Sequence, residues 1–517
     1  MLPPLLPLLL ILIVGSYPYL GDASFLRLSP GAVLAVVLGM QALLVLEAYR
    51  RRQQLLAAGP VDSATELLYQ FGRRLRKLRS LSLVLLALCL FNFGWGELVH
   101  DRWRLMGLLA PLAQVIWMLP VVAAWVGFWL LEYPLESLAA DQEALAAALE
   151  GRKFAPMPPR WAYVLMQLRH AMYLPLVLLL ALALRRLAET LLRNWGWGNL
   201  AYGAGLAVTL AVLLLAGRLV VWVWSTSKLT VEPLRSRLES MAAAGGVRFT
   251  DIRVWHTYHR VVNAAILGPV PMARYFLITD ALLARLDDNQ IQAVFAHEVG
   301  HGHHRHLWWY LAAFAAGGFA AAAVASAGMS LWPRYDTFWQ ITNYALVAVF
   351  LILVFPLISR LCEHQADWYA AQCMAARPQP LAAMARDGVT EVKSTAAAVV
   401  AAADQLQESN DLNDRADYLG LEVAEAAPPP RLPPLVAGAE RFAQALLAVV
   451  GLTHRPRDRK GWMHPSISDR VALVRRLARD PQAVKAFDRR QRRLRQWIAA
   501  SLVVGVVLVV LATLYGG

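Results

Sequence analysis

The residues with the clearest chemical meaning are His297 and His301, which enclose Glu298 in the sequence His-Glu-Val-Gly-His. On an α-helix, residues four apart lie on one face about 6 Å apart along the axis, so their imidazoles can bind one ion. Glu298 then lies beside the metal without binding it, where its carboxylate can take a proton from bound water. The motif predicts a zinc site with His297 and His301 as ligands and Glu298 as the general base.

A catalytic zinc ion needs a third protein ligand and keeps a fourth position open for water. Glu363 is the best candidate, because two hydrophobic segments separate it from His301. Two membrane crossings return a chain to the side that it left, so both ligand groups would meet at one membrane interface. Asp367 follows four residues later on the same helical face. We expect Asp367 to accept the outer N–H of a ligating histidine and fix its tautomer.

His303, His304 and His306 follow the motif directly and are an alternative source of ligands. Only His304 shares the face of the first two histidines on a continuous helix. It would lie about 10 Å along the axis from His297, too far for bonds of about 2.1 Å to one ion. We therefore interpret these three histidines as helix residues at the membrane interface, with a secondary metal or substrate role as the alternative.

The composition indicates an integral membrane protein. Hydrophobic residues make up 58% of the 517 positions and charged residues 17%, whereas soluble domains are about half apolar and a quarter charged. The apolar residues gather in segments of which most can cross a hydrocarbon core about 30 Å thick. We predict nine such spans, at approximately 1–20, 31–48, 80–97, 106–131, 170–185, 201–224, 307–332, 343–361 and 497–515. The first lacks a basic leading region and a clear cleavage site, so we expect an uncleaved anchor.

The net charge of +14 is explained by topology, because basic loops are retained in the cytoplasm. The strongly basic segments 50–79 and 455–495 both fall in the cytoplasm if nine crossings start inside. The same model places the two large segments 225–306 and 362–496 in the cytoplasm and the C-terminus on the far side. No nucleic-acid recognition signature accompanies the charge, so we expect no nucleic-acid partner.

The two large segments differ in their predicted structure. Residues 225–306 hold short β-like runs at 252–255, 261–267 and 275–278, followed by a helical stretch from near Asp280. Residues 362–496 are mostly helical and are broken by a proline-rich linker. We predict an N-terminal membrane domain of about six spans at 1–224 and a last span at 497–517. Between them, the two parts of a peptidase domain, 225–306 and 362–496, lie on either side of a transmembrane hairpin at 307–361.

These residues together resemble a family of integral-membrane zinc peptidases that includes the type-one CAAX prenyl proteases and the bacterial quality-control protease HtpX. The likeness covers roughly 260–475, and the length of the chain favours the CAAX branch. Gly302 stands where those proteases usually have Trp, and the last span is extra, which bears on the substrate more than on the chemistry. The likeness rests on Asn263-Ala264, the stretch Asp280 to His301, the stretch Arg360 to Asp367, His464-Pro465-Ser466 and Arg470.

The resemblance implies a helical membrane shell around a gluzincin-like α+β peptidase domain that faces the cytoplasm and holds one zinc ion per chain. It implies that His464 and Arg470 lie near the metal, where they are candidates for stabilising the tetrahedral oxyanion. It also suggests that Asn263 helps to hold the substrate backbone. The expected setting is the lipid bilayer of a bacterial inner membrane, and the expected partners are peptide or protein substrates. Whether a substrate is prenylated and how many chains assemble are left open.

The sequence therefore predicts a mainly α, polytopic membrane protein that acts as a zinc metalloendopeptidase. A transporter is one alternative, but transporters tend to place charged residues at mid-membrane, and Arg218 is the one clear case here. A catalytically inactive membrane scaffold is the other alternative. The presence of three ligands together with Glu298 argues against it.

Overall fold

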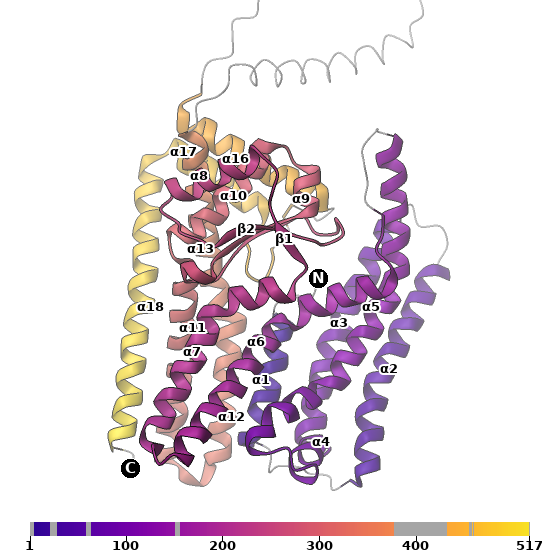
Figure 1. The fold of residues 1–517 in the computed structure, drawn as a ribbon, viewed down its shortest axis with the longest axis vertical. Coiled ribbons are helices and arrows are strands. Elements are labelled where there is room, and N and C mark those ends of the chain that lie inside the picture. Colours follow the sequence, from indigo (N-terminus) through magenta and orange to yellow (C-terminus); the bar gives the residue numbers. More distant parts are fainter. Residues whose placement is uncertain are drawn as a thin grey trace, which may run out of the picture.

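The computed structural model describes residues 5–20, 28–57, 64–149, 156–376, 432–453, 457–458 and 460–515. Long helices run side by side through most of the molecule, and a small sheet with its own helices caps one end of them (Figure 1). This arrangement confirms the prediction of a mainly α, polytopic membrane protein.

The N-terminal helices pack around a core of large aromatic side chains, with Trp117, Trp125 and Phe128 almost fully buried. Two prolines, Pro120 and Pro134, lie inside the longest of these helices, α5. The bounds are Leu5–Leu20 for α1, Pro30–Ala57 for α2, Ala64–Phe91 for α3, Trp95–Glu97 for α4, Ala110–Leu149 for α5, Arg160–Asn194 for α6 and Gly198–Val223 for α7.

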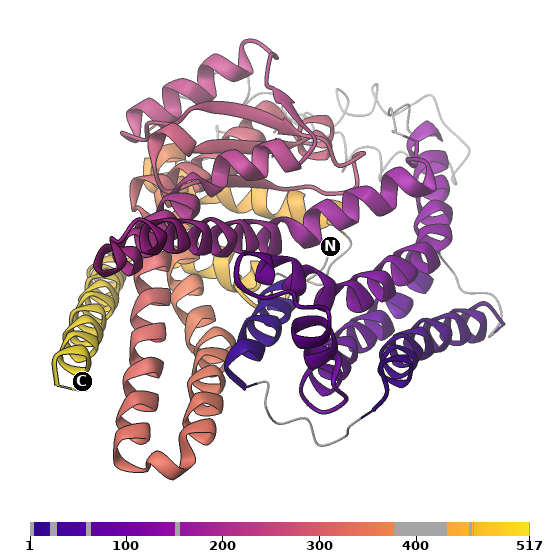
Figure 2. The same cartoon turned by 60° about the horizontal axis from the view of Figure 1, so that its bottom comes forward.

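The later helices build the remaining spans and the end of the molecule that carries the sheet, where the peptidase domain was predicted (hereafter the peptidase end). Their bounds are Leu234–Ala244 for α8, Asp280–Arg285 for α9, Asp288–His303 for α10, His306–Leu331 for α11, Asp336–Val349 for α12, Phe355–Ala375 for α13, Pro434–Thr453 for α16, Ile467–Arg479 for α17 and Pro481–Tyr515 for α18. Figure 2 shows the α11–α12 hairpin and α18 on one side of the molecule and α2, α3 and α5 on the other. Helix α1 contacts helices of both groups, including α3 and α12.

Seven of the described helices are long and apolar enough to cross a membrane, or eight if α3 and α4, bent by 69°, form one span. One of the seven, at Pro434–Leu452, was not predicted from the sequence. The apolar part of α1, Leu5–Tyr17, is shorter than the roughly 20 residues that a span needs. The second half of α18 follows α11 along its length, but it is not among the seven, so the count of nine stays a prediction.

The unpredicted apolar helix, α16, belongs to the hydrophobic core that it shares with α10, α13, α17 and the sheet. Its Ala439, Phe442 and Ala443 are buried there at 1% exposure or less. Figure 1 places α16 beside α10 and α17, at the capped end of the bundle. The hydropathy of α16 is therefore accounted for by packing against protein.

The sheet has the strand order β1-β2-β4-β3, so β3 forms one edge. Strand β1 runs antiparallel to β2, β2 parallel to β4, and β3 antiparallel to β4. Three strands fall on the three β-like runs predicted above, whereas the three-residue β1 was missed. The bounds are Thr226–Lys228 for β1, Asp251–Trp255 for β2, Ala264–Leu267 for β3 and Tyr275–Thr279 for β4.

Two glycines let the elements approach closely enough to fix the peptidase end on the bundle. A Cβ atom at Gly300 of α10 would lie 3.0 Å from the Cα of Ala366, so the bare backbone lets α13 pack directly against α10. A Cβ atom at Gly217 of α7 would lie 2.3 Å from the carbonyl oxygen of Ala273, in the β3–β4 connection. Membrane helix α7 is thereby held against the edge of the sheet.

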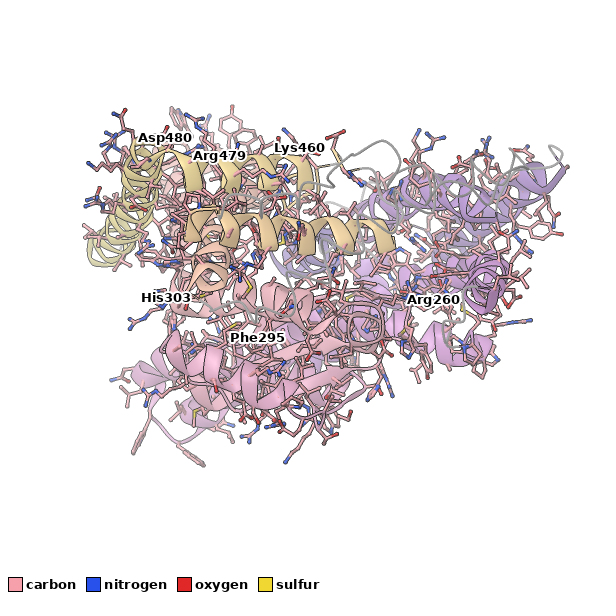
Figure 3. All side chains as sticks on the ribbon, turned by 90° about the horizontal axis from the view of Figure 1, so that it is seen from above. Arg260, Phe295, His303, Lys460, Arg479 and Asp480 are labelled. Atoms are coloured by element: carbon pink, nitrogen blue, oxygen red, sulfur yellow. The ribbon has the colours of Figure 1, made fainter. Side chains whose placement is uncertain are left out.

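A further link joins the peptidase end to the N-terminal helices. Figure 3 shows Arg260 on the side of the peptidase end that faces those helices, and its guanidinium lies 2.5 Å from the carboxylate of Glu136 on α5. Arg285 of α9 pairs with Glu143, two helical turns further along α5. The C-terminal half of α5 is thus attached to the loop before β3 and to the helix before α10.

Candidate metal centre

Helices α10 and α13 bring together the three residues predicted as metal ligands. His297 and His301 project from α10 and Glu363 from α13, and all three are buried. The Nε2 atoms of the two histidines are 3.2 Å apart. The carboxylate oxygens of Glu363 lie 3.5 Å from His301 Nε2 and 3.6 Å from His297 Nε2. The four-residue spacing brings His297 and His301 together on α10, and the close approach of α13 at Gly300 adds Glu363 to the same compact group of donor atoms.

The spacing of these donor atoms fits a single metal ion. A tetrahedral zinc ion with bonds of about 2.0–2.2 Å holds its ligand atoms about 3.3–3.5 Å apart. The three separations in the structure scatter closely around that value. Two imidazoles and one carboxylate are also the donor types found in catalytic zinc sites. The buried group can therefore bind a metal ion.

The outer nitrogen of His297 contacts a buried ion pair. His297 Nδ1 lies 2.9 Å from Asp367 Oδ1, and Arg470 of α17 donates two hydrogen bonds to the same carboxylate, from Nε at 2.9 Å and from Nη2 at 2.5 Å. Because a carboxylate only accepts, His297 carries its proton on Nδ1 and turns the lone pair of Nε2 toward the donor group. Asp367 thus holds the position expected for it beside a ligating histidine.

Burial alone would lower the pKa of Arg470, but the carboxylate of Asp367 outweighs it and raises that pKa. The guanidinium is therefore charged at any working pH. Its Nε and Nη2 are both used by Asp367. Arg470 was expected to stabilise an oxyanion. In the structure its two short hydrogen bonds go to Asp367, and Nη2 also lies 3.4 Å from His297 Nδ1, a longer contact than either.

The outer nitrogen of His301 contacts a residue that the sequence did not single out for this position. His301 Nδ1 lies 2.9 Å from His306 Nδ1, and His306 Nε2 lies 3.1 Å from Oε1 of Gln365. With the Gln365 oxygen facing it, His306 Nε2 carries the proton and its Nδ1 accepts. His301 then donates from Nδ1, which leaves the lone pair of Nε2 for the donor group.

His306 was interpreted as a helix residue at the membrane interface, and it is the first residue of α11, but this helix is not continuous with the one that carries His301. The helix α10 ends at His303, and Arg305 adopts a left-handed conformation with φ 56° before α11 begins. The change of direction brings His306 back against His301, where it is 1% exposed. His303 instead contacts the carbonyl of Gly245 through Nδ1.

Glu298 is half-buried beside the donor group, and its Oε2 accepts a hydrogen bond of 2.9 Å from the backbone N–H of Ile266 in β3. His464 lies next to Glu363, with Nδ1 2.9 Å from Glu363 Oε2 and a side chain that is 61% exposed. The negative charge of Glu363 raises the pKa of the His464 imidazole. Asn263 lies at the start of β3 with an exposed side chain, and its backbone bonds to Thr279.

A comparison of the sequence with known protein families finds a match over the residues that form this site. The family described as Peptidase family M48 matches residues 228–478, a stretch that contains the sheet from β2 onward, α10, α13 and α17. Those residues are similar to peptidase family M48. The M48 segment holds every residue predicted for the site, while the helices α1 to α7 lie before it. The same chain therefore combines several helices that are long and apolar enough to cross a membrane with a segment similar to a peptidase family.

Two other comparisons add little to the M48 similarity. Among solved structures, the crystal structure of S. mikatae Ste24p matches with a TM-score of 0.34 and 15% sequence identity, over 85% of this chain and 97% of that chain. At this TM-score we conclude nothing about the chain from the likeness. No curated protein matches the sequence.

Proposed function

We propose that this protein is a zinc metalloendopeptidase that hydrolyses peptide bonds of membrane-associated or unfolded proteins. The observation that carries the proposal is the buried group of His297, His301 and Glu363, whose donor atoms all lie within 4.8 Å of one another. One zinc ion per chain fits this group. When bound, zinc supplies a Lewis acid that polarises the scissile carbonyl and lowers the pKa of a water.

Glu298 is the proposed general base. The hydrogen bond from Ile266 N–H to Oε2 fixes the carboxylate beside the histidine pair. In this position Glu298 takes the proton of the attacking water and later delivers it to the leaving amine. His464, exposed and next to Glu363, is the proposed donor to the oxyanion. Arg470 is proposed as a positioning residue that acts through Asp367 and His297.

The edge strand β3 supports an extended peptide as substrate. Because the carbonyl of Asn263 accepts from Thr279 N–H and strands alternate, the backbone groups of Ala264 and Ile266 face away from β4. The bond from Ile266 to Glu298 agrees with this direction. A substrate strand that pairs with this edge would lay its backbone alongside Glu298. Asn263, at the start of the edge, is the proposed contact to the substrate backbone.

Metal removal tests the proposed function. Purified protein treated with a chelator and then freed of it should lose cleavage of a fluorescent unstructured peptide to the background rate. Addition of about one equivalent of zinc should restore cleavage, because the three ligands form without large rearrangement. The measurement is the initial rate beside the zinc content per chain. Undiminished cleavage by metal-free protein would contradict the proposal.

We further propose that the site faces the cytoplasm. The arginines 489, 490, 492, 493 and 495 lie in the first half of α18, which starts beside α17 at the peptidase end (Figure 1). Basic residues next to spans are retained on the cytoplasmic side. This end is therefore the cytoplasmic one, and the loop around Arg334, between α11 and α12, lies on the far side.

Cysteine labelling tests this orientation. Lys460, whose side chain is 63% exposed, and Arg334, which is exposed, would each be replaced by Cys. A membrane-impermeant thiol reagent should label Lys460→Cys in inside-out vesicles but not in intact cells, and Arg334→Cys in intact cells. The parent protein, with its three cysteines, measures the background. The reverse pattern would place the site on the other side and leave the zinc proposal untouched.

His306 provides a test of the geometry around His301. His306→Ala removes the acceptor that holds His301 Nδ1–H, so zinc affinity should fall about 10- to 100-fold. His306→Asn should recover part of it, because the amide oxygen can accept where Nδ1 did. Competition with a chelating dye measures the affinity. His304→Ala is the control, since within the described residues the His304 imidazole has ring contacts, including one with His306 at 5.7 Å, but no hydrogen bond to His301. Unchanged zinc affinity in His306→Ala would remove its positioning role.

A further inference from the structure

A basic cavity of about 520 Å³ opens where the membrane helices meet the sheet, and none of the metal-centre residues lines it. Its wall combines α6, α7 and three strands, and it contains three arginines, Arg169, Arg218 and Arg253. No acidic residue is part of the wall. The complete lining is Arg169, Arg218, Val221, Trp222, Val223, Trp224, Ser225, Thr226, Arg253 and Tyr275.

Two of these arginines have their charge available. Arg169 and Arg218 are exposed, and within the described part of the chain neither forms a hydrogen bond or an ion pair with a carboxylate. Arg253 is held in place by Thr226, through its hydroxyl at 3.0 Å and its carbonyl at 3.1 Å. Its ion pair with Asp251 is long at 3.4 Å, and that carboxylate also binds Arg235. The cavity therefore carries an excess of positive charge.

The position of Arg218 points to a ligand that enters from the bilayer. Arg218 lies five residues before α7 ends at Val223, about 8 Å along the axis from that end. A guanidinium at this depth reaches toward the headgroup level. Trp222 beside it is 81% exposed, and tryptophans gather at the same level in membrane proteins.

The floor of the cavity is rigid. Trp224 stacks on Trp255 with ring centroids 4.1 Å apart and planes within 14°. His170 packs edge-on against both rings and accepts a hydrogen bond of 3.0 Å from Trp255 Nε1. The close packing of α7 at Gly217 against the β3–β4 connection also holds α7 in place next to the cavity. The guanidinium groups of Arg169 and Arg218 thus lie on helices whose positions are fixed before a ligand binds, which makes the site preorganised.

We propose that this cavity binds the phosphate of an anionic phospholipid headgroup, with Arg169 and Arg218 as its main ligands and Arg253 completing the positive field. Guanidinium groups pair with phosphate oxygens through two parallel hydrogen bonds. Basic cavities between membrane helices suit anionic headgroups. The acyl chains would follow the lipid-facing surface of α7 next to Trp222. The binding site is independent of the proposed zinc chemistry.

The test uses the full chain in nanodiscs of phosphatidylcholine with a small fraction of phosphatidylglycerol, and native mass spectrometry to count retained phosphatidylglycerol. Arg169→Gln/Arg218→Gln should weaken retention roughly tenfold or more, because two charge-assisted contacts are lost. Each single variant should lose part of the affinity, so the result does not depend on the double variant alone. The control Arg193→Gln/Arg334→Gln removes two exposed charges, one in the last turn of α6 and one between α11 and α12, neither of which lines the cavity, and should retain the lipid as the parent does.

Equal retention in the parent and in the Arg169→Gln/Arg218→Gln variant would overturn the proposal, as would an equal loss in the control. An added arm with inorganic phosphate separates the two possible sources of the anion. Phosphate at about 10 mM should leave the lipid bound, because it lacks the acyl chains that add binding free energy for each buried CH₂. Complete displacement of the lipid by phosphate would instead assign the cavity to a soluble anion and refute the lipid.

Discussion

The variant Glu298→Gln should retain about one zinc ion per chain while its peptide hydrolysis falls about 1,000-fold or more. His297, His301 and Glu363 remain intact, so the donor group is unchanged. The amide oxygen of glutamine can still accept the N–H of Ile266, which holds Glu298 at 2.9 Å in the parent. The local fold should therefore persist, whereas a neutral amide cannot take a proton from water.

Three measurements on the same preparations decide this prediction: the metal content, the initial rate of peptide cleavage and the thermal unfolding midpoint. Glu239→Gln is a suitable control, because the Glu239 side chain is 43% exposed and, among the described residues, it pairs with Arg235 one turn away and with no group of the metal centre. The control should cleave at the parent rate. Parent-like cleavage by Glu298→Gln would refute the general-base role, and loss of zinc from that variant would show that Glu298 supports the metal instead.

Much of the metal centre follows from local periodicity. The spacing of His297 and His301 requires only a helix. That helix begins at Asp288, and a capping box formed by Asp287 and Gln290 stabilises its start. The predicted return of the chain through two spans places Glu363 next to the histidine pair, as the donor separations of 3.5 and 3.6 Å show. These features depend on residues close in sequence or on the even number of crossings, which hydropathy reports directly.

The parts that the sequence did not reveal depend on changes of direction and on long-range contacts. His306 contacts His301 only because Arg305 turns the chain with φ 56°, and a helical projection that assumes a continuous helix moves His306 off the site. The hydropathy of α16 does not distinguish a span from a helix packed in a protein core. From the sequence, Arg218 is a single charged residue in a predicted span. Only the fold shows that Arg169 and Arg253 line the same cavity.

Arg470→Gln should weaken zinc binding about 10- to 100-fold, because Arg470 holds Asp367, and Asp367 holds His297. At saturating zinc, most of the cleavage rate should return. The coupling has its own test. Asp367→Asn should cost much less zinc affinity in the Arg470→Gln background than in the parent, because the two residues act through one contact. Equal costs in both backgrounds would separate Arg470 from Asp367 and contradict the positioning role.

His464→Ala should give the opposite pattern, with zinc affinity close to that of the parent and kcat at saturating zinc lower by about 100-fold or more. The reason is geometric. His464 touches Glu363 with a side chain that is 61% exposed, so it can reach a substrate, whereas Arg470 is 8% exposed and occupied by Asp367. Cleavage within a few-fold of the parent rate in His464→Ala would contradict its role as the donor to the oxyanion. A kcat defect in Arg470→Gln that zinc does not relieve would assign oxyanion stabilisation to Arg470 instead.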